Sequence, residues 1–351
     1  MDNFVYEALP TRVIFGAGKL ETLAAEVSRL GSKALVLCTP EQKSAAHEAA
    51  QMLGALSVGI FDRATMHVPI ETARAAQSEA SRLGADVYVA IGGGSTTGLG
   101  KAIALESGKP IVCVPTTYAG SEMTPIWGLT ENGVKKTGRD IKVLPRTVIY
   151  DPTLTLSLPT TLSATSGMNA IAHSVEALYS QNRNPIVSLM AEESIRSLAR
   201  SLPRVVQEPK NLEARSEALY GAWLAGISLG SVGMALHHKL CHTLGGSFNL
   251  PHAEVHTVII PHVTAYNRDA APEAMRRIAA ALGQSDAAEG LFQLELTLGT
   301  PTKLSDLRMK QEDLDLAAEL ASQNPYYNPR PVTRGGIRAL LEDAFFGNHP
   351  R

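Results

Sequence analysis

The chain has 351 residues, of which 44% are hydrophobic and 19% are charged, and this composition excludes a disordered protein. Its 32 basic residues nearly balance its 34 acidic ones, and only 5% of the residues are aromatic, so a general nucleic-acid-binding protein is a poor fit. At about 150 residues per domain, the length predicts two domains.

The cysteines and the N-terminal residues indicate the compartment. Cys38, Cys113 and Cys241 are too few and too scattered for a disulfide framework or a four-cysteine metal site. The residues after Met1 form neither a basic nor an apolar leader segment. No apolar stretch reaches the roughly eighteen residues that a membrane-spanning helix needs. We therefore expect a cytoplasmic protein without membrane partners.

The first half of the chain alternates between β-branched runs and alanine-rich stretches with helical spacing. The predicted strands are 34–37, 57–61, 87–91, 111–114 and 146–150. The predicted helices between them are 20–30, 41–53, 70–83 and 97–105. This alternation is typical of a parallel sheet with crossover helices, and the apolar runs predict strands that are covered on both faces. Asn132 and Gly133 predict a hairpin turn.

The pattern changes near residue 155, where apolar residues begin to recur every three or four positions. Helices are predicted over 160–179, 187–205, 212–229, 236–245 and 272–282. We therefore expect an α/β domain over 1–157 and an all-helical domain over 158–351. The segment 324–331 is too rich in proline for a helix, and it predicts an ordered surface loop with two aromatic anchors.

A glycine cluster lies between a predicted strand and a predicted helix, and it consists of Gly92, Gly93 and Gly94 followed by Ser95. Glycine allows close approach of an anion, and a helix N-terminus offers unpaired N–H groups. The spacing matches neither the dinucleotide fingerprint nor the Walker loop, so a tight turn without a ligand is the alternative. The polar segment 115–122 follows the next strand, where its hydroxyls suit ribose and phosphate oxygens or form a solvated turn.

Six of the ten histidines fall between residues 237 and 262. His238 and His242 share one face of a predicted helix, and His252 follows ten residues later. His173 lies four residues after Asn169 on an earlier predicted helix. These residues could converge on one ion or one substrate. We expect a structural role for the histidines without such a paired neighbour, which are His237, His256 and His262.

The candidate site carries no anionic metal ligand. A divalent cation that is bound by neutral imidazoles usually has a carboxylate or a thiolate among its ligands as well. Asn169 brings no charge, and Cys241 lies one residue off the face of His238 and His242. We therefore expect no metal. Cys241 has two possible roles, as a buried apolar residue or as a residue beside the substrate.

These segments together resemble the iron-containing alcohol dehydrogenase family, which has the fold of dehydroquinate synthase. The resemblance covers nearly the whole chain and rests on 15–18, 92–95, 115–117, 151–152 and 238–252. It implies a nucleotide-binding α/β domain, an all-helical C-terminal domain and an active site in the cleft between them. The metal ligands of the family are an aspartate and three histidines. Three positions match as His173, His238 and His252, whereas Asn169 stands in place of the aspartate, and Gly98 replaces a second aspartate.

Longer segments look like one branch of that family, and they are 92–101, 115–124, 167–173, 237–242 and 324–331. This branch reduces the carbon–carbon double bond of maleylacetate to give 3-oxoadipate in bacterial breakdown of resorcinol, hydroxyquinol and chlorinated aromatics. The resemblance implies NADH or NADPH, a dicarboxylate substrate and a homodimer. Thr39 stands where the family often has a ribose-binding aspartate, which would allow the 2′-phosphate of NADPH.

The implied reaction sends hydride to the carbon β to a ketone and leaves negative charge on the ketone oxygen. Protonated imidazoles can stabilise that oxygen, and one of them can then supply the proton. The residues expected in catalysis are His173, His238, His242, His252 and Asn169. Those expected at the nucleotide are Thr39, Gly92, Gly93, Gly94, Ser95, Thr116, Thr117 and Ser121. Those expected near the substrate are Tyr118, Cys241 and Tyr326, with Lys239, Lys136 or Arg139 for its carboxylates.

Three other functions remain as alternatives. The first is a metal-dependent alcohol or polyol dehydrogenase of the same family, against which Asn169 argues. The second is a zinc-dependent lyase of the dehydroquinate synthase kind, which would need a basic phosphate site. The third is a nucleotide-binding protein without catalytic activity, which gives no reason for the histidine cluster.

Overall fold

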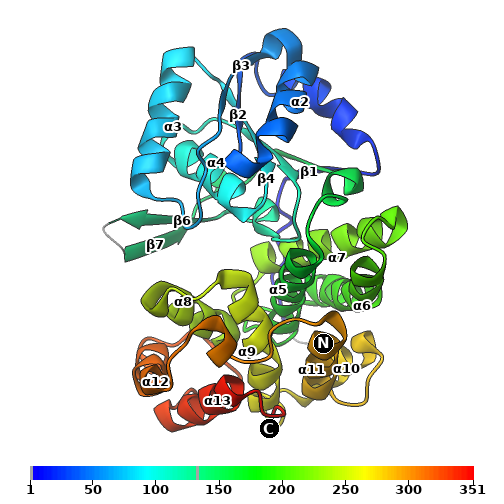
Figure 1. The fold of residues 1–351 in the computed structure, drawn as a ribbon, viewed down its shortest axis with the longest axis vertical. Coiled ribbons are helices and arrows are strands. Elements are labelled where there is room, and N and C mark those ends of the chain that lie inside the picture. The colour runs from blue at the N-terminus through cyan, green and yellow to red at the C-terminus, as the bar shows by residue number, and fades with distance from the viewer. Residues whose placement is uncertain (1–2, 132–133) are drawn as a thin grey trace. The chain divides into compact units, whose positions relative to one another are not determined.

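The computed structural model describes residues 3–131 and 134–351, which fall into two compact units. One unit is Ala8–Leu158, and the other is Pro159–Arg351 together with the described residues up to Glu7 (Figure 1). The expected α/β and all-helical fold classes are confirmed. The residues before Ala8 differ from the prediction, because they group with the helical unit rather than with the sheet.

A six-stranded parallel sheet forms the centre of the first unit. Its spatial order is β1-β8-β5-β4-β2-β3, and the strands span Arg12–Phe15, Thr147–Tyr150, Ile111–Pro115, Val87–Gly92, Ala34–Leu37 and Ser57–Phe61. All five predicted strands are present within one residue at each end. The edge strand β1 was not predicted, although Val13, Ile14 and Phe15 form a short apolar run in it.

Helices cover both faces of this sheet (Figure 1). They are α1 (Leu23–Ser28), α2 (Lys43–Leu53), α3 (Ile70–Leu83) and α4 (Gly94–Ser107). Side chains of α1 and α2 pack on Val36, Val89 and Val112 from one side. Gly100 of α4 lies against Ala90 and Ile111, whose side chains point to the other side. Burial on both faces explains why the strands are apolar at nearly every position.

A separate antiparallel pair consists of β6 (Ile126–Glu131) and β7 (Val134–Arg139). The strands pair as the predicted hairpin requires, whereas the predicted turn at 132–133 lies outside the described residues. Lys136 of β7 is exposed and pairs with Glu131, and Arg139 is also exposed.

In its described residues the second unit has helices and no strands, and α5 (Thr160–Tyr179) is buried along most of its length. The others are α6 (Pro185–Gln207), α7 (Leu212–Ser231), α8 (Leu236–Phe248), α9 (His252–Tyr266), α10 (Pro272–Leu282), α11 (Ala287–Leu298), α12 (Leu314–Ser322) and α13 (Arg334–Phe346). Helix α5 packs against α6, α7 and α9. Helices α9, α11, α12 and α13 were not predicted, and α9 contains Pro261 in its interior.

None of the described helices is by itself long and apolar enough to cross a membrane. Helices α7 and α8 pass that test only as a pair, by length and composition, and they are bent by 95° where they meet.

The proline-rich segment 324–331 packs against the end of α9. The side chains of Asn328 and Asn267 exchange hydrogen bonds, and the Arg330 guanidinium lies 4.1 Å from the centre of the Tyr266 ring. The two tyrosines expected as anchors, Tyr326 and Tyr327, are 39% and 43% exposed. Polar residues therefore hold the end of this loop, while Tyr326, although partly exposed, contacts His242 of α8 through its hydroxyl.

Candidate active site

The glycine loop and the polar segment start at neighbouring strand ends, because β4 and β5 are adjacent and end level with each other. Their register pairs Gly92 with Pro115, and the Thr116 amide donates to the Gly92 carbonyl at 3.1 Å. On the other side of β4 lies β2, which Thr39 follows by two residues. From β2 the chain runs outward to the edge strand β3, and it then crosses back to β4 on the other side of β2. The strand order therefore reverses between β2 and β4, and open α/β sheets bind ligands at such a point.

Gly92 makes room for polar side chains around this loop. Its φ is +149°, and a Cβ atom there would lie 2.2 Å from Gln42 Oε1 and 2.5 Å from Thr96 Oγ1. Both oxygens are buried without a hydrogen-bond partner in the described part of the chain, while Gln42 Nε2 donates to Thr116 Oγ1. Helix α4 starts next to Gly93 without a side-chain cap. Unpartnered polar atoms beside an uncapped helix N-terminus fit a phosphate-containing nucleotide.

A buried lysine organises the neighbouring segment 115–126. Lys101 Nζ donates to the backbone oxygen of Ser121 at 2.6 Å and to its hydroxyl at 3.2 Å, and also to Thr124 and Ile126. Burial lowers the pKa of Lys101 to about 7. The Ser121 hydroxyl, which is expected at the nucleotide, thus accepts a hydrogen bond from Lys101 in this structure. Tyr118, expected near the substrate, is fully buried in this segment.

The helical unit gathers the histidines of three helices. Helix α5 carries Asn169 and His173, α8 carries His238, and α9 carries His252. The rings of His173 and His238 have their centroids 5.1 Å apart. The ring of His256 is 4.9 Å from His238 and 4.3 Å from His252. His173 and His238, one from each predicted pair, therefore converge, and the ring of His256 packs against those of His238 and His252.

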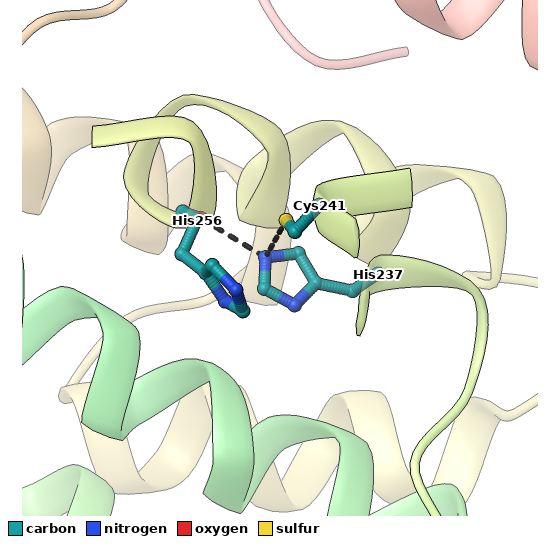
Figure 2. A group of neighbouring side chains, drawn as sticks. All are labelled: His237, Cys241 and His256. Atoms are coloured by element: carbon teal, nitrogen blue, oxygen red, sulfur yellow. Dashed lines mark hydrogen bonds between the residues drawn. The ribbon is translucent and has the colours of Figure 1, made fainter. Parts of the chain in front are cut away.

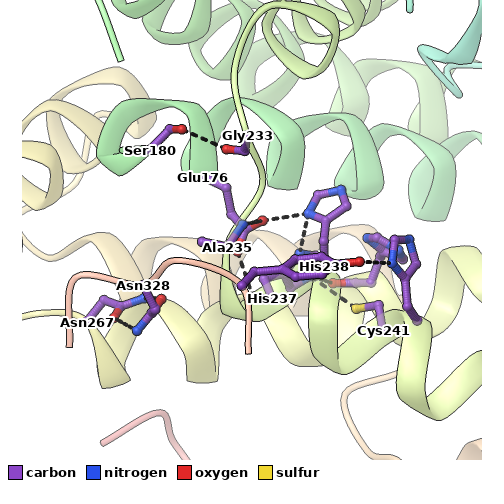
Figure 3. A network of polar contacts seen from close by, with 12 residues as sticks. Glu176, Ser180, Gly233, Ala235, His237, His238, Cys241, Asn267 and Asn328 are labelled. Carbon is purple, nitrogen blue, oxygen red and sulfur yellow. Dashed lines mark hydrogen bonds and ion pairs between the residues drawn. The ribbon is translucent and has the colours of Figure 1, made fainter. Parts of the chain in front are cut away.

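A buried carboxylate that was not predicted from the sequence, Glu176, connects His238 to the start of α8. Glu176 Oε2 accepts a hydrogen bond from His238 Nδ1 at 2.7 Å and one from the Ala235 amide at 2.8 Å, and Oε1 accepts from the His237 amide at 2.7 Å (Figure 3). Although burial opposes it, the neighbouring His238 lowers the pKa of Glu176, so the group is ionised. Glu176 caps α8 and turns His238 Nε2 away from itself.

Several buried polar atoms around this point have no hydrogen-bond partner among the described residues. They are Asn169 Oδ1, His173 Nδ1, His238 Nε2 and both ring nitrogens of His256. Imidazole nitrogens and amide oxygens are acceptable ligands for iron or zinc. A carboxylate behind a ligating histidine strengthens such a site, and Glu176 supplies that charge. The donor set therefore fits a divalent metal ion.

His237 and His256, expected to be structural, belong to the same cluster. With Cys241 they form a buried group whose ligand atoms lie within 4.8 Å of one another (Figure 2), and Glu176, His237 and His238 form another. Burial lowers the pKa of His237 to about 4, and it raises the pKa of the Cys241 thiol. Cys241 packs in the core of the unit, 3.5 Å from His237 Nε2.

Two expected site residues lie at the margin of the cluster, and one histidine lies apart from it. His242 is exposed, with its ring centroid 6.1 Å from that of His238, and its Nδ1 lies 3.3 Å from the hydroxyl of Tyr326. His262 is buried, and the charge that acts on it comes from Asp343 rather than from the cluster.

Comparison with known proteins shows the class of this protein. Residues 10–152 match the family model described as iron-containing alcohol dehydrogenase, and residues 163–345 match the C-terminal model of the Fe-containing alcohol dehydrogenase family. The chain therefore belongs to the iron-containing alcohol dehydrogenase family of oxidoreductases.

Within that family the similar proteins share a more specific name. The chain is 61% identical to the maleylacetate reductase of Burkholderia cepacia, with 100% of both chains covered, and 57% identical to that of Sphingobium indicum, with 99% of each covered. The crystal structure of maleylacetate reductase from Agrobacterium tumefaciens is 53% identical over 100% of both chains, with a TM-score of 0.97.

Membership of this family contradicts the expectation that the protein needs no metal. An iron-containing family implies bound iron or another metal, and the described residues include two groups that could hold one. The prediction considered the ligand position at Asn169 and overlooked Glu176. The negative charge is present, but it acts through His238 rather than as a direct ligand at position 169.

Proposed function

We propose that this protein reduces the carbon–carbon double bond of maleylacetate to give 3-oxoadipate, with NADH or NADPH as the reductant, in bacterial breakdown of aromatic compounds. The observation that carries the proposal is 61% identity over the whole chain to a protein named maleylacetate reductase. Further relatives that share 47–57% identity over nearly the whole chain are also named maleylacetate reductase. An alcohol or polyol dehydrogenase is therefore not favoured.

The reaction needs a hydride, a place for negative charge and a proton. NAD(P)H, when bound, supplies the hydride to the carbon β to the ketone. The electron pair of the double bond moves toward the ketone oxygen, and the carbon next to the ketone then takes a proton. A metal ion held by Asn169, His173, His238 and His252 would supply Lewis acidity for that oxygen.

The side chains of the site orient the imidazole rings and set their protonation. Glu176 fixes His238 in one tautomer, so its Nε2 faces the cluster rather than the helix backbone. Burial and the neighbouring histidines lower the pKa of His173 well below its usual value. The lowered pKa favours the neutral ring, so in this proposal His173 acts as a hydrogen-bonding group or a ligand rather than as a protonated imidazole.

The direct test is NADH or NADPH oxidation with freshly prepared maleylacetate, followed by the loss of nicotinamide absorbance. The expected result is saturable turnover with formation of 3-oxoadipate. An enzyme that oxidises simple alcohols but leaves maleylacetate unchanged would contradict the proposal. We also propose a cytoplasmic homodimer, as the resemblance implies, and molecular-mass measurement by light scattering tests the dimer.

Substitution of Gly92 by alanine is expected to weaken nucleotide binding about tenfold or more. The added methyl group would collide with Gln42 and Thr96 in a backbone conformation that L-residues rarely adopt. Titration of NADH and NADPH by nicotinamide fluorescence measures the change. The control is Gly246→Ala, because a Cβ there would meet nothing within 4 Å beyond its chain neighbours and its own helix backbone. Equal affinities for the wild type and Gly92→Ala would remove this loop from the nucleotide site.

Metal loading gives a second expected result. After stripping with a chelator and reloading with Fe²⁺ or Zn²⁺, the protein should retain about one ion per chain and melt at a higher temperature. The double variant His173→Asn/His252→Asn should retain far less, whereas His349→Asn, at an exposed position, should match the wild type. Mass spectrometric metal analysis reads the stoichiometry. Equal retention by the double variant would place the metal elsewhere.

A further inference from the structure

Three polar side chains meet beside the histidine cluster, where α8 contacts the loop 324–331. The Tyr326 hydroxyl lies 3.3 Å from His242 Nδ1, and Lys239 Nζ lies 6.0 Å from the centre of the Tyr326 ring. Lys239 and His242 are three residues apart on α8, so they occupy neighbouring positions on its surface. The reaction steps described above use none of these three side chains, although Tyr326 is expected near the substrate and Lys239 is one of three candidates for its carboxylates.

The position of this group suits the far end of an extended ligand. The His242 ring is near both the buried cluster and the loop. Its centroid lies 6.1 Å from that of the His238 ring and 6.3 Å from that of the Tyr326 ring. His238 is only 4% exposed, whereas Tyr326 is 39% exposed. If the ketone oxygen of a substrate reaches the buried cluster, a carboxylate two or three bonds from the ketone carbon would lie toward Lys239 and Tyr326.

The charge at this place is positive. Lys239 forms no ion pair in the described part of the chain, and the acidic group that acts on Tyr326 is Glu176, which His238 and two amides already occupy. Burial raises the pKa of the Tyr326 hydroxyl, so it remains a hydrogen-bond donor. An ammonium group, an imidazole and a phenol hydroxyl are the donors that bind a carboxylate.

We propose that Lys239, His242 and Tyr326 form a carboxylate-binding subsite, which takes one carboxylate of an oxo-dicarboxylate substrate and selects it over uncharged enones. This inference rests on the proposed function, since maleylacetate carries a carboxylate on each side of its ketone. Lys239 supplies the positive charge, and a hydrogen bond from the Tyr326 hydroxyl orients the carboxylate.

Two measurements on the full-length enzyme test the subsite. One is the Kd of the product 3-oxoadipate, by calorimetry with the oxidised nucleotide present, and the other is the KM for maleylacetate. Lys239→Met should raise this Kd and this KM about tenfold to a hundredfold, because the substrate carboxylate loses its hydrogen bond to a charged ammonium group. The kcat should change less than about threefold, since the lost interaction serves binding. Lys239→Arg should recover most of the affinity, and Tyr326→Phe should show a smaller rise. Lys310→Met is the control, at an exposed lysine that pairs with Glu312 on the surface.

The outcomes separate the subsite from the reaction. If Lys239→Met and Tyr326→Phe both leave Kd and KM within twofold of the wild type, the subsite is overturned. It is also overturned if Lys239→Met lowers kcat with KM unchanged, or if the wild type binds no 3-oxoadipate. If the wild type binds 3-oxoadipate and Lys239→Met does not, while maleylacetate gives no turnover, the proposed reaction fails and the subsite stands.

Discussion

Replacement of His238 by asparagine is expected to lower kcat/KM for maleylacetate about a hundredfold to ten-thousandfold, the range for loss of a positioned acid, base or ligand. An asparagine amide can still donate to Glu176 in place of Nδ1, which keeps the 2.7 Å contact of the wild type. It cannot replace Nε2, which has no partner in the described structure and faces the cluster. The variant therefore loses chemistry and retains the fold.

Steady-state kinetics and thermal melting check this prediction together. The melting temperature of His238→Asn should stay within a few degrees of the wild type when both are measured without added metal. His349→Asn serves as the matched control, because His349 is exposed and contacts Glu289 far from the cluster along the chain. A His238→Asn enzyme with a third or more of wild-type activity would exclude a central role for this ring.

Replacement of Glu176 by alanine is expected to lower the free energy of unfolding by about 3–5 kcal/mol, the cost of breaking a buried charged pair. The change leaves the amides of Ala235 and His237, as well as His238 Nδ1, without their acceptor. Glu176→Gln keeps one acceptor oxygen and should lose less. Both variants should also bind metal more weakly, because His238 is no longer fixed.

Urea unfolding, followed by far-ultraviolet circular dichroism, measures the stability of the Glu176 variants. Glu319→Ala is a suitable control, since Glu319 is exposed on α12, and its loss should change stability by less than about 0.5 kcal/mol. If Glu176→Ala unfolds at the same urea concentration as the control, Glu176 does not hold the start of α8 in solution.

The sheet was predictable because burial on both faces makes its strands apolar throughout. Strands β2 and β3 begin and end where the sequence indicates, and so does helix α5, whose apolar residues are uninterrupted by proline. Helix α9 was missed because Pro261 and three histidines obscure its apolar face. Pro261 lies in the C-terminal half of α9, and the buried surroundings of this helix stabilise it despite the proline.

The candidate site was predictable where residues repeat at helical spacing. The same rule would have found His256, four residues after His252, once α9 had been recognised as a helix. Glu176 also carried a signal, as the one acidic residue in an apolar helix of twenty residues. Gln42 gave no signal, because its contact with Thr116 joins segments 74 residues apart.

The order of the strands also constrains how the chain is made. Among the described residues, the first strand, β1, pairs with β8 alone, so that Arg12 lies opposite Thr147. Asp151 closes the same junction by accepting hydrogen bonds from the amides of Gly18 and Leu20. During synthesis, the β2–β5 portion can assemble as soon as it leaves the ribosome, whereas the N-terminal strand must wait until residue 150 has emerged. The segment that is synthesised first is thus among the last to find its place in the sheet.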